Sequence, residues 1–262
     1  MTTTIARSYV VTDHGHLHLR TAGTEGPLPT LLMLHQVPNS GQIFEPVIPL
    51  LAEDRRVIAA DIPGFGMSDP LPDPQTIEGY AEVIGKALRD VVPGPMDIVG
   101  YHTGAAIAAV LANTGIIEIR RVAMVSVPVL TDAERAHFAA LPPIPFDEAG
   151  EWARSEWQRT WLWRGPGQRI DDLLKSFAEK MRPNARRAGA RAIASFNMEP
   201  ALRALRQPLL IARPRDDLWE ATARAEVLRP DAIHVTLAEF GHGLWSAAPE
   251  RMIAILKGFF SE

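Results

Sequence analysis

The chain has 262 residues, of which 47% are hydrophobic and 22% charged, as expected for one large folded domain. Its formal net charge of −4 argues against a nucleic acid or an anionic membrane as partner, and the absence of Cys excludes disulfides and thiolate metal sites. The first residues form no apolar signal segment, and no apolar run approaches the ~20 residues that span a bilayer. We therefore expect a cytoplasmic protein whose partner is a small-molecule substrate; no pattern specifies an oligomeric state.

The first elements are two predicted strands, residues 8–12 and 16–21, which a short turn joins into a hairpin. His14, His16 and His18 alternate here, so some share a face and could in principle bind a metal ion. Because no further ligand lies nearby in the sequence, we favour the interpretation that they are solvated strand histidines.

Alternation of strands and helices follows. Continuous apolar runs predict buried strands at residues 30–35, 56–61 and 121–127, and residues 76–91 have the periodicity of an amphipathic helix. After a break, the pattern resumes with strands at 208–212 and 232–237 and helices at 221–228 and 249–260. Strands that are apolar throughout and alternate with helices predict a mainly parallel sheet covered by helices on both faces.

The break in this pattern extends from residue 131 to residue 206, where we find helical periodicity and no strand. Helices are expected at residues 131–140, 147–163, 170–181 and 186–197. Four of the six Trp residues lie in this segment, as packed core residues or as a wall over a pocket. The sequence therefore predicts a core of residues 1–130 and 207–262 with a helical cap, residues 131–206, inserted in it.

A short apolar run around residue 98 leads through Gly100-Tyr-His-Thr-Gly104 into an Ala-rich helical segment. Glycines two residues either side of a central residue suit a sharp strand-to-helix turn that exposes the central side chain. This is the geometry of the nucleophile elbow, G-x-S-x-G. Here the central residue is His102 in place of Ser.

Together with this elbow, further motifs occur in a fixed order along nearly the whole chain, which resembles the α/β-hydrolase family. They are His35-Gln-x-Pro, Asp61-x-Pro-Gly-x-Gly-x-Ser68-Asp69, an Asp just after a late strand, and Gly241-His242 before the last helix. The resemblance implies an eight-stranded, mostly parallel α/β-hydrolase sheet. The family's role for Asp61 and Ser68 is structural.

Carried over position by position, the resemblance places His102 in the nucleophile position, Asp216 in the acid position and His242 in the base position. Asp216 is preferred over Asp217 for its distance from the preceding strand, although loop lengths vary and the alternative stays open. The oxyanion hole would be the backbone N–H groups of Thr103 and Gln36. Gln36 stands where the family commonly has Gly. Two further residues are expected at the oxyanion hole or in contact with substrate, His35 and Tyr101.

Imidazole at position 102 allows several chemistries. It could attack an ester as a nucleophile to give an acyl-imidazole, act as a base, or mark an inactive site. Thr103 does not readily replace it, because the elbow exposes only its central residue. Two neighbouring imidazoles are expected to depress each other's pKa. No metal site and no cofactor are expected.

The function that we favour from the sequence is cofactor-free hydrolysis of a small, partly apolar ester, lactone or related carbonyl compound. A second hypothesis is a non-hydrolytic enzyme, such as a lyase, decarboxylase or cofactor-free oxygenase, in which His102 and His242 move protons. A third is a binding protein without activity. The products of turnover distinguish the first two, and tight binding without turnover would indicate the third.

Overall fold

In the computed structural model, which describes residues 3–142, 145, 147–182 and 185–261, eight strands form one sheet. Its order is β1-β2-β4-β3-β5-β6-β7-β8; β1 and β2 run antiparallel to their neighbours, and the remaining strands are parallel to one another. This confirms the predicted hairpin and the mainly parallel sheet. The strands are β1 (Ala6–Thr12), β2 (Gly15–Ala22), β3 (Thr30–Leu34), β4 (Val57–Ala60), β5 (Met96–Tyr101), β6 (Ile119–Val125), β7 (Leu209–Pro214) and β8 (Ile233–Leu237).

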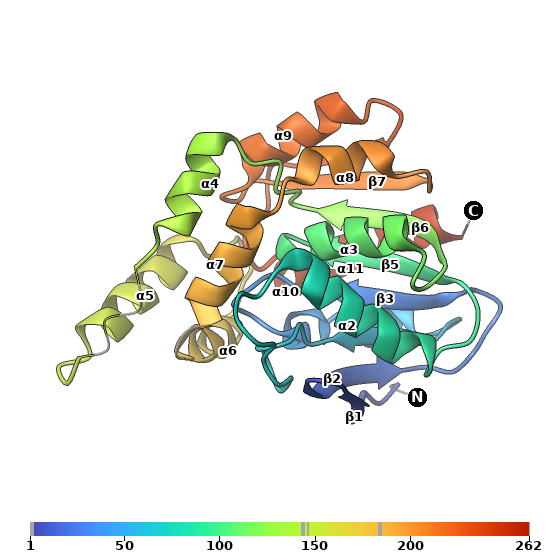
Figure 1. Cartoon of the computed structure of the whole chain (residues 1–262), viewed down its shortest axis with the longest axis horizontal. Coiled ribbons are helices and arrows are strands. Elements are labelled where there is room, and N and C mark those ends of the chain that lie inside the picture. The colour runs from blue at the N-terminus through green and yellow to red at the C-terminus, as the bar shows by residue number, and fades with distance from the viewer. Residues whose placement is uncertain (1–2, 143–144, 146, 183–184, 262) are drawn as a thin grey trace.

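Helices cover both faces of this sheet. As a result, its central strands β3, β4 and β5 are buried along their whole length. One face packs against α2 (Ile77–Arg89), α3 (Thr103–Thr114), α8 (Met198–Ala204) and α9 (Trp219–Leu228). The other packs against η1 (Gly41–Phe44), α1 (Ile48–Leu51), α10 (Leu244–Ala247) and α11 (Pro249–Phe260). The two apolar layers hold β5 and the start of α3 at the centre of the molecule (Figure 1).

Between β6 and β7, the described residues form helices and no strand, apart from one isolated bridge at Arg164. The helices α4 (Asp132–Ala139), α5 (Glu151–Leu162), α6 (Ile170–Lys180) and α7 (Ala185–Ser195) gather at one side of the sheet, on the left in Figure 1. Thr131 begins α4 with a capping box to Glu134. In contrast, α8 lies beside α3 and α9, so the last helix of this segment packs on the core. The division into core and cap stays a prediction.

A buried polar cluster fixes the turn after β4. Asp61 accepts hydrogen bonds from Arg20 at 2.6 Å and from the backbone N–H of Gly41 at 2.7 Å, and it lies 2.8 Å from Nδ1 of His18. These contacts are those of a structural carboxylate, and Ser68 donates to the backbone oxygen of the same residue. The interpretation of His18 as a solvated histidine is wrong, because the inward-facing side of β2 buries it against Asp61.

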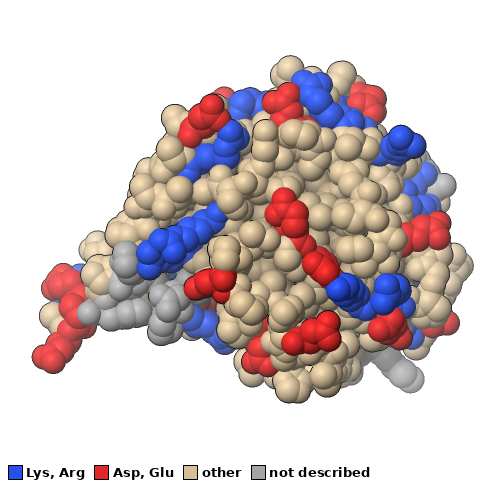
Figure 2. Space-filling view, in the orientation of Figure 1, with Lys and Arg blue, Asp and Glu red and all other residues tan. Residues whose placement is uncertain are grey.

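The surface shows no extended region of one charge on the face in Figure 2, where acidic and basic side chains alternate in small groups between uncharged areas. This agrees with the small net charge of the chain. Among the described residues, every helix is too short or too polar to cross a membrane.

Candidate active site

The strand-to-helix turn between β5 and α3 places His102 at its vertex, with φ 52° and ψ −115°. A Cβ on Gly100 would lie 2.4 Å from the backbone oxygen of Gly104. A Cβ on Gly104 would lie 2.1 Å from the backbone oxygen of Leu34. Both glycines are therefore required for the close approach of α3 to β5 and β3, as the spacing of the motif predicts.

His102 is hydrogen-bonded to a buried carboxylate. Its Nε2 lies 2.9 Å from Oδ2 of Asp216, which follows β7. The hydroxyl of Ser126, at the end of β6, donates to the same oxygen at 2.5 Å, and the backbone N–H of Leu218 donates to Oδ1 at 2.9 Å. Asp216 is 5% exposed, so these contacts hold its charge in a fixed orientation.

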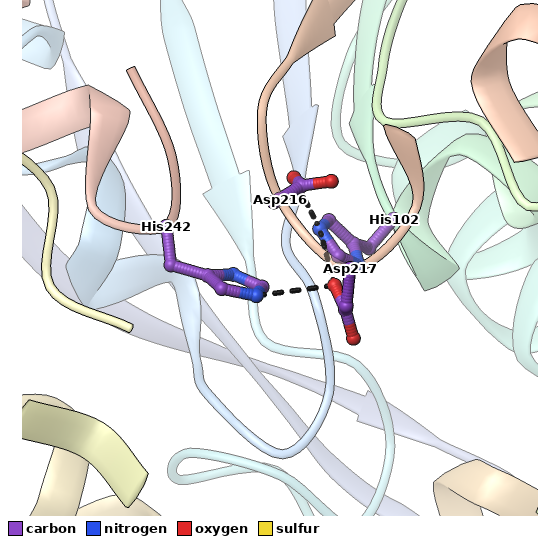
Figure 3. Close-up of side chains that lie close together, drawn as sticks. All are labelled: His102, Asp216, Asp217 and His242. Atoms are coloured by element: carbon purple, nitrogen blue, oxygen red, sulfur yellow. Dashed lines mark hydrogen bonds and ion pairs between the residues drawn. The ribbon is translucent and has the colours of Figure 1, made fainter. Parts of the chain in front are cut away.

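His242 is paired with the other aspartate of the β7 loop. Its Nε2 lies 3.1 Å from Oδ1 of Asp217, and the same oxygen is 3.9 Å from Nε2 of His102 (Figure 3). The expected pairing of His242 with Asp216 is therefore wrong. The physical reason is that the loop after β7 turns Asp216 inward to Ser126 and His102, so that only the next carboxylate faces His242.

The rings of His102 and His242 are 5.3 Å apart between centroids, with a carboxylate for each. Burial alone would lower the pKa of His102, but the charges of Asp216 and Asp217 and the hydrogen bond to Asp216 outweigh burial and raise it. This direction is opposite to the one expected from two neighbouring imidazoles. Burial would raise the pKa of both aspartates, yet their contacts with the two histidines hold both pKa values below the ordinary range.

A cavity of about 630 Å³ opens beside these side chains. His102, Asp217 and His242 contribute to its wall, as do Gln36 and Thr103. In the described part of the chain, the backbone N–H groups of Gln36 and Thr103 donate to no other protein group. The two residues expected to form the oxyanion hole therefore both border the cavity.

Of the two further residues expected at the site, Tyr101 borders the cavity and His35 does not. His35 is fully buried and does not line the cavity: its Nε2 accepts from the backbone N–H of Ile62 at 2.8 Å, and its Nδ1 lies 2.8 Å from the oxygen of Gln36. Its side chain thus fixes the backbone beside Gln36, and the expectation of substrate contact is wrong for this ring. Tyr101 is 1% exposed, packs edge-on against His102 at 4.6 Å between centroids, and borders the cavity. Burial and the two aspartates raise the pKa of its hydroxyl.

The segment between β6 and β7 contributes Trp163 to the cavity wall, where its ring lies edge-on to His242 at 5.8 Å. Trp157 instead packs against Phe177, with 5.5 Å between ring centroids. Trp161 and Trp163 are 42% and 45% exposed, and none of the four Trp residues belongs to the buried core. The interpretation as a wall over a pocket therefore applies to Trp163, and the interpretation as packed core residues is wrong. Ser126 was not singled out from the sequence; the available signal was its position at the end of β6, next to β5 in the sheet.

One ligand atom from each of four side chains lies within 4.8 Å of all the others. We call these side chains the His–Asp cluster: His102, Asp216, Asp217 and His242. Two imidazoles and two carboxylates can exchange protons with a substrate, and they are also ligands that bind divalent metal ions.

Comparison with known proteins identifies the family. Residues 29–177, more than half of the chain, match the alpha/beta hydrolase fold family. An uncharacterized hydrolase of Saccharomyces cerevisiae is 44% identical over 59 residues, and this match spans 22% of the chain and only 20% of the yeast protein. This chain covers less than a third of the length of the yeast protein and of two other curated relatives.

Other proteins match over most of their length. The 2-(acetamidomethylene)succinate hydrolase of Mesorhizobium japonicum is 25% identical over 93% of this chain and 91% of its own. Among solved structures, an esterase from Exiguobacterium antarcticum has a TM-score of 0.82 at 16% identity and covers 98% of this chain and 100% of its own. At that identity, the structural likeness establishes the fold alone.

Proposed function

Because the chain belongs to the alpha/beta hydrolase fold family, we propose that it hydrolyses a small, partly apolar ester, lactone or related carbonyl compound in the 630 Å³ cavity. The catalytic side chains in this proposal are His102 and His242, each held by its own aspartate. The similarity to the 2-(acetamidomethylene)succinate hydrolase of Mesorhizobium japonicum supports this reaction class.

The observation that carries the proposal is the position of His102. It stands at the vertex of the elbow, hydrogen-bonded at 2.9 Å to the buried Asp216, with the ring of His242 5.3 Å away. Each imidazole presents Nε2 to a carboxylate, which leaves Nδ1 as the nitrogen available for chemistry in the neutral ring. Nearby hydroxyls are poorer candidates: Ser126 is fully buried against Asp216, and Thr103 is the first residue of α3 and 5% exposed.

In the proposed reaction, Nδ1 of His102 attacks the carbonyl carbon while the amides of Gln36 and Thr103 stabilise the oxyanion. The bond to the alcohol oxygen then breaks, and His242 as general acid gives the leaving oxygen its proton. Water adds to the acyl-imidazole with His242 as general base, which releases the acid and restores the neutral ring. Asp217 takes over the role expected of Asp216 towards His242, since it accepts from that ring at 3.1 Å.

The test is a substrate screen on wild type, His102→Ala and His102→Ser, with 2-(acetamidomethylene)succinate and activated esters included. His102→Ala should lower kcat/KM by at least ~100-fold, since acid–base catalysis is typically worth 10²–10⁴ and a nucleophile more. His102→Ser restores a hydroxyl beside His242 and should hydrolyse activated esters. The matched control is His16→Ala, an exposed histidine paired with Asp69 outside the cavity. Full activity of His102→Ala on a substrate that wild type hydrolyses would make His102 structural.

A second candidate function is non-hydrolytic proton transfer by the same two histidines. The observation that favours it is the raised pKa of His102, which keeps a proton available at the elbow, where no hydroxyl nucleophile stands. Turnover in ¹⁸O-labelled water separates the two reactions. Hydrolysis places the label in the acid product, whereas proton transfer turns over an acidic C–H compound without incorporating it.

A further inference from the structure

We propose that the His–Asp cluster binds one divalent ion of a first-row transition metal, with Zn²⁺ as the probe. No metal site is expected from the sequence, whereas the structure brings one ligand atom from each of these four side chains together. This inference goes beyond the proposed function and does not depend on it.

The spacing of the ligand atoms supports the site. Nitrogen and oxygen ligands bind Zn²⁺ at about 2.0–2.2 Å, which places ligand atoms about 3.4 Å apart in a tetrahedral site. In the cluster, the separations are 2.9 Å for His102–Asp216, 3.1 Å for His242–Asp217 and 3.9 Å for His102–Asp217. All four ligand atoms lie within 4.8 Å of one another, so each separation differs from the tetrahedral spacing by at most about 1.4 Å.

The charge and chemistry of the ligands also suit a transition metal. Two carboxylates neutralise a divalent cation, which lowers the cost of placing that charge in a partly buried site. Imidazole nitrogen favours zinc and its neighbours over Mg²⁺ and Ca²⁺, which prefer oxygen ligands throughout. We therefore expect Zn²⁺ to bind and Mg²⁺ not to compete.

Surrounding contacts hold the ligands in place, as outer-shell groups do in metal sites. Ser126 and Leu218 hydrogen-bond the two oxygens of Asp216, the elbow fixes His102, and Trp163 packs edge-on against His242. Asp217, in contrast, is about half exposed towards the cavity. The cluster thus has a rigid inner side and an accessible outer side through which an ion can enter.

Metal binding and the proposed reaction compete for the same side chains. A bound ion takes the Nε2 lone pairs and the carboxylate oxygens, so each neutral ring then carries its proton on Nδ1, the nitrogen that the proposed reaction uses. The same side chains therefore either hold a metal ion or move protons, and the two states are mutually exclusive.

The experiment uses the full chain, freed of metal with a chelator, then dialysed against Zn²⁺ with and without excess Mg²⁺. Bound metal is measured by mass spectrometry, and the affinity by calorimetry. Wild type and the control His16→Ala should each take up one zinc per chain, and Zn²⁺ should raise their Tm. Ser126→Ala should weaken binding by about 10–100-fold, and loss of a ligand in Asp217→Ala or His242→Ala by more.

The side chain of Asp217 is 48% exposed and that of His242 is 24% exposed. Folding of each ligand variant is checked by circular dichroism and a cooperative urea transition. Failure of wild type to take up zinc would overturn the proposal. So would zinc uptake by folded Asp217→Ala and His242→Ala equal to that of wild type. The zinc experiment involves no substrate, so a negative result in it leaves the hydrolysis proposal untouched. A negative substrate screen likewise leaves the zinc proposal untouched.

Discussion

Gly104→Ala tests whether the close packing at the elbow positions His102. The new Cβ would lie 2.1 Å from the backbone oxygen of Leu34, 2.5 Å from its carbonyl carbon and 2.9 Å from the oxygen of His35. Ordinary contact begins at 3.4 Å, so the start of α3 must move away from β3 by more than 1 Å. All three neighbours are backbone atoms and cannot rotate away.

The expected result is a loss of about 2–3 kcal/mol in the free energy of unfolding, since overpacking a rigid interior typically costs 1–3 kcal/mol. The matched control is Gly258→Ala in α11, where a Cβ meets nothing within 4 Å. Alanine there should stabilise the protein by about 0.5–1 kcal/mol through helix propensity. Urea unfolding of both variants measures the difference, about 3 kcal/mol in total.

Gly104→Ala should also lower the hydrolytic rate, because the displaced helix carries the amide of Thr103 and the vertex at His102. A Gly104→Ala variant as stable as Gly258→Ala would refute the reasoning. It would mean that α3 is not held against β3, and that the glycine spacing of the motif has another cause.

Two further predictions concern stability. Burial lowers the pKa of His35 to about 4. Between pH 6.5 and pH 4, His35 is therefore protonated in the unfolded chain and neutral in the folded chain. Stability should therefore fall by about 3 kcal/mol as the pH drops from 6.5 to 4, and His35→Gln should show a smaller slope in urea titrations across that range. Asp97→Asn should cost about 3–5 kcal/mol, because it removes the buried negative charge that pairs with Arg55 at 2.8 Å and with Arg120 at 2.7 Å. Glu82→Gln, which breaks an exposed pair, should cost less than about 1 kcal/mol in the same assay.

The sequence predicts the fold well because apolar patterning and turn motifs are local. The hairpin, the six following strands and the long helices lie within a few residues of their expected positions. The elements that were missed are short, such as α1 and α10 with 4 residues each, or continue a helical segment, as α8 does. Their amphipathic pattern is too brief to detect, and tertiary packing determines them.

The site is less predictable, because it depends on how loops turn. The motifs identify His102, Asp216 and His242, and the structure brings all three together. The direction of adjacent side chains such as Asp216 and Asp217 depends on the backbone path after β7, which spacing does not encode. The hydrogen bond from Ser126 likewise requires β6 and β7 to be neighbours, a property of the whole sheet.

Backbone strain in this region argues against an inactive site. Among the described residues, the non-glycine residues with positive φ are His102, at 52°, and Ser126, at 57°. Such conformations cost about 1–3 kcal/mol each and persist where the surrounding structure imposes them. Both side chains bond to the same oxygen of Asp216, at 2.9 and 2.5 Å. A histidine that only filled space would need neither the strain nor the buried charge, so the cost of holding Asp216 against His102 is best explained by use of that imidazole.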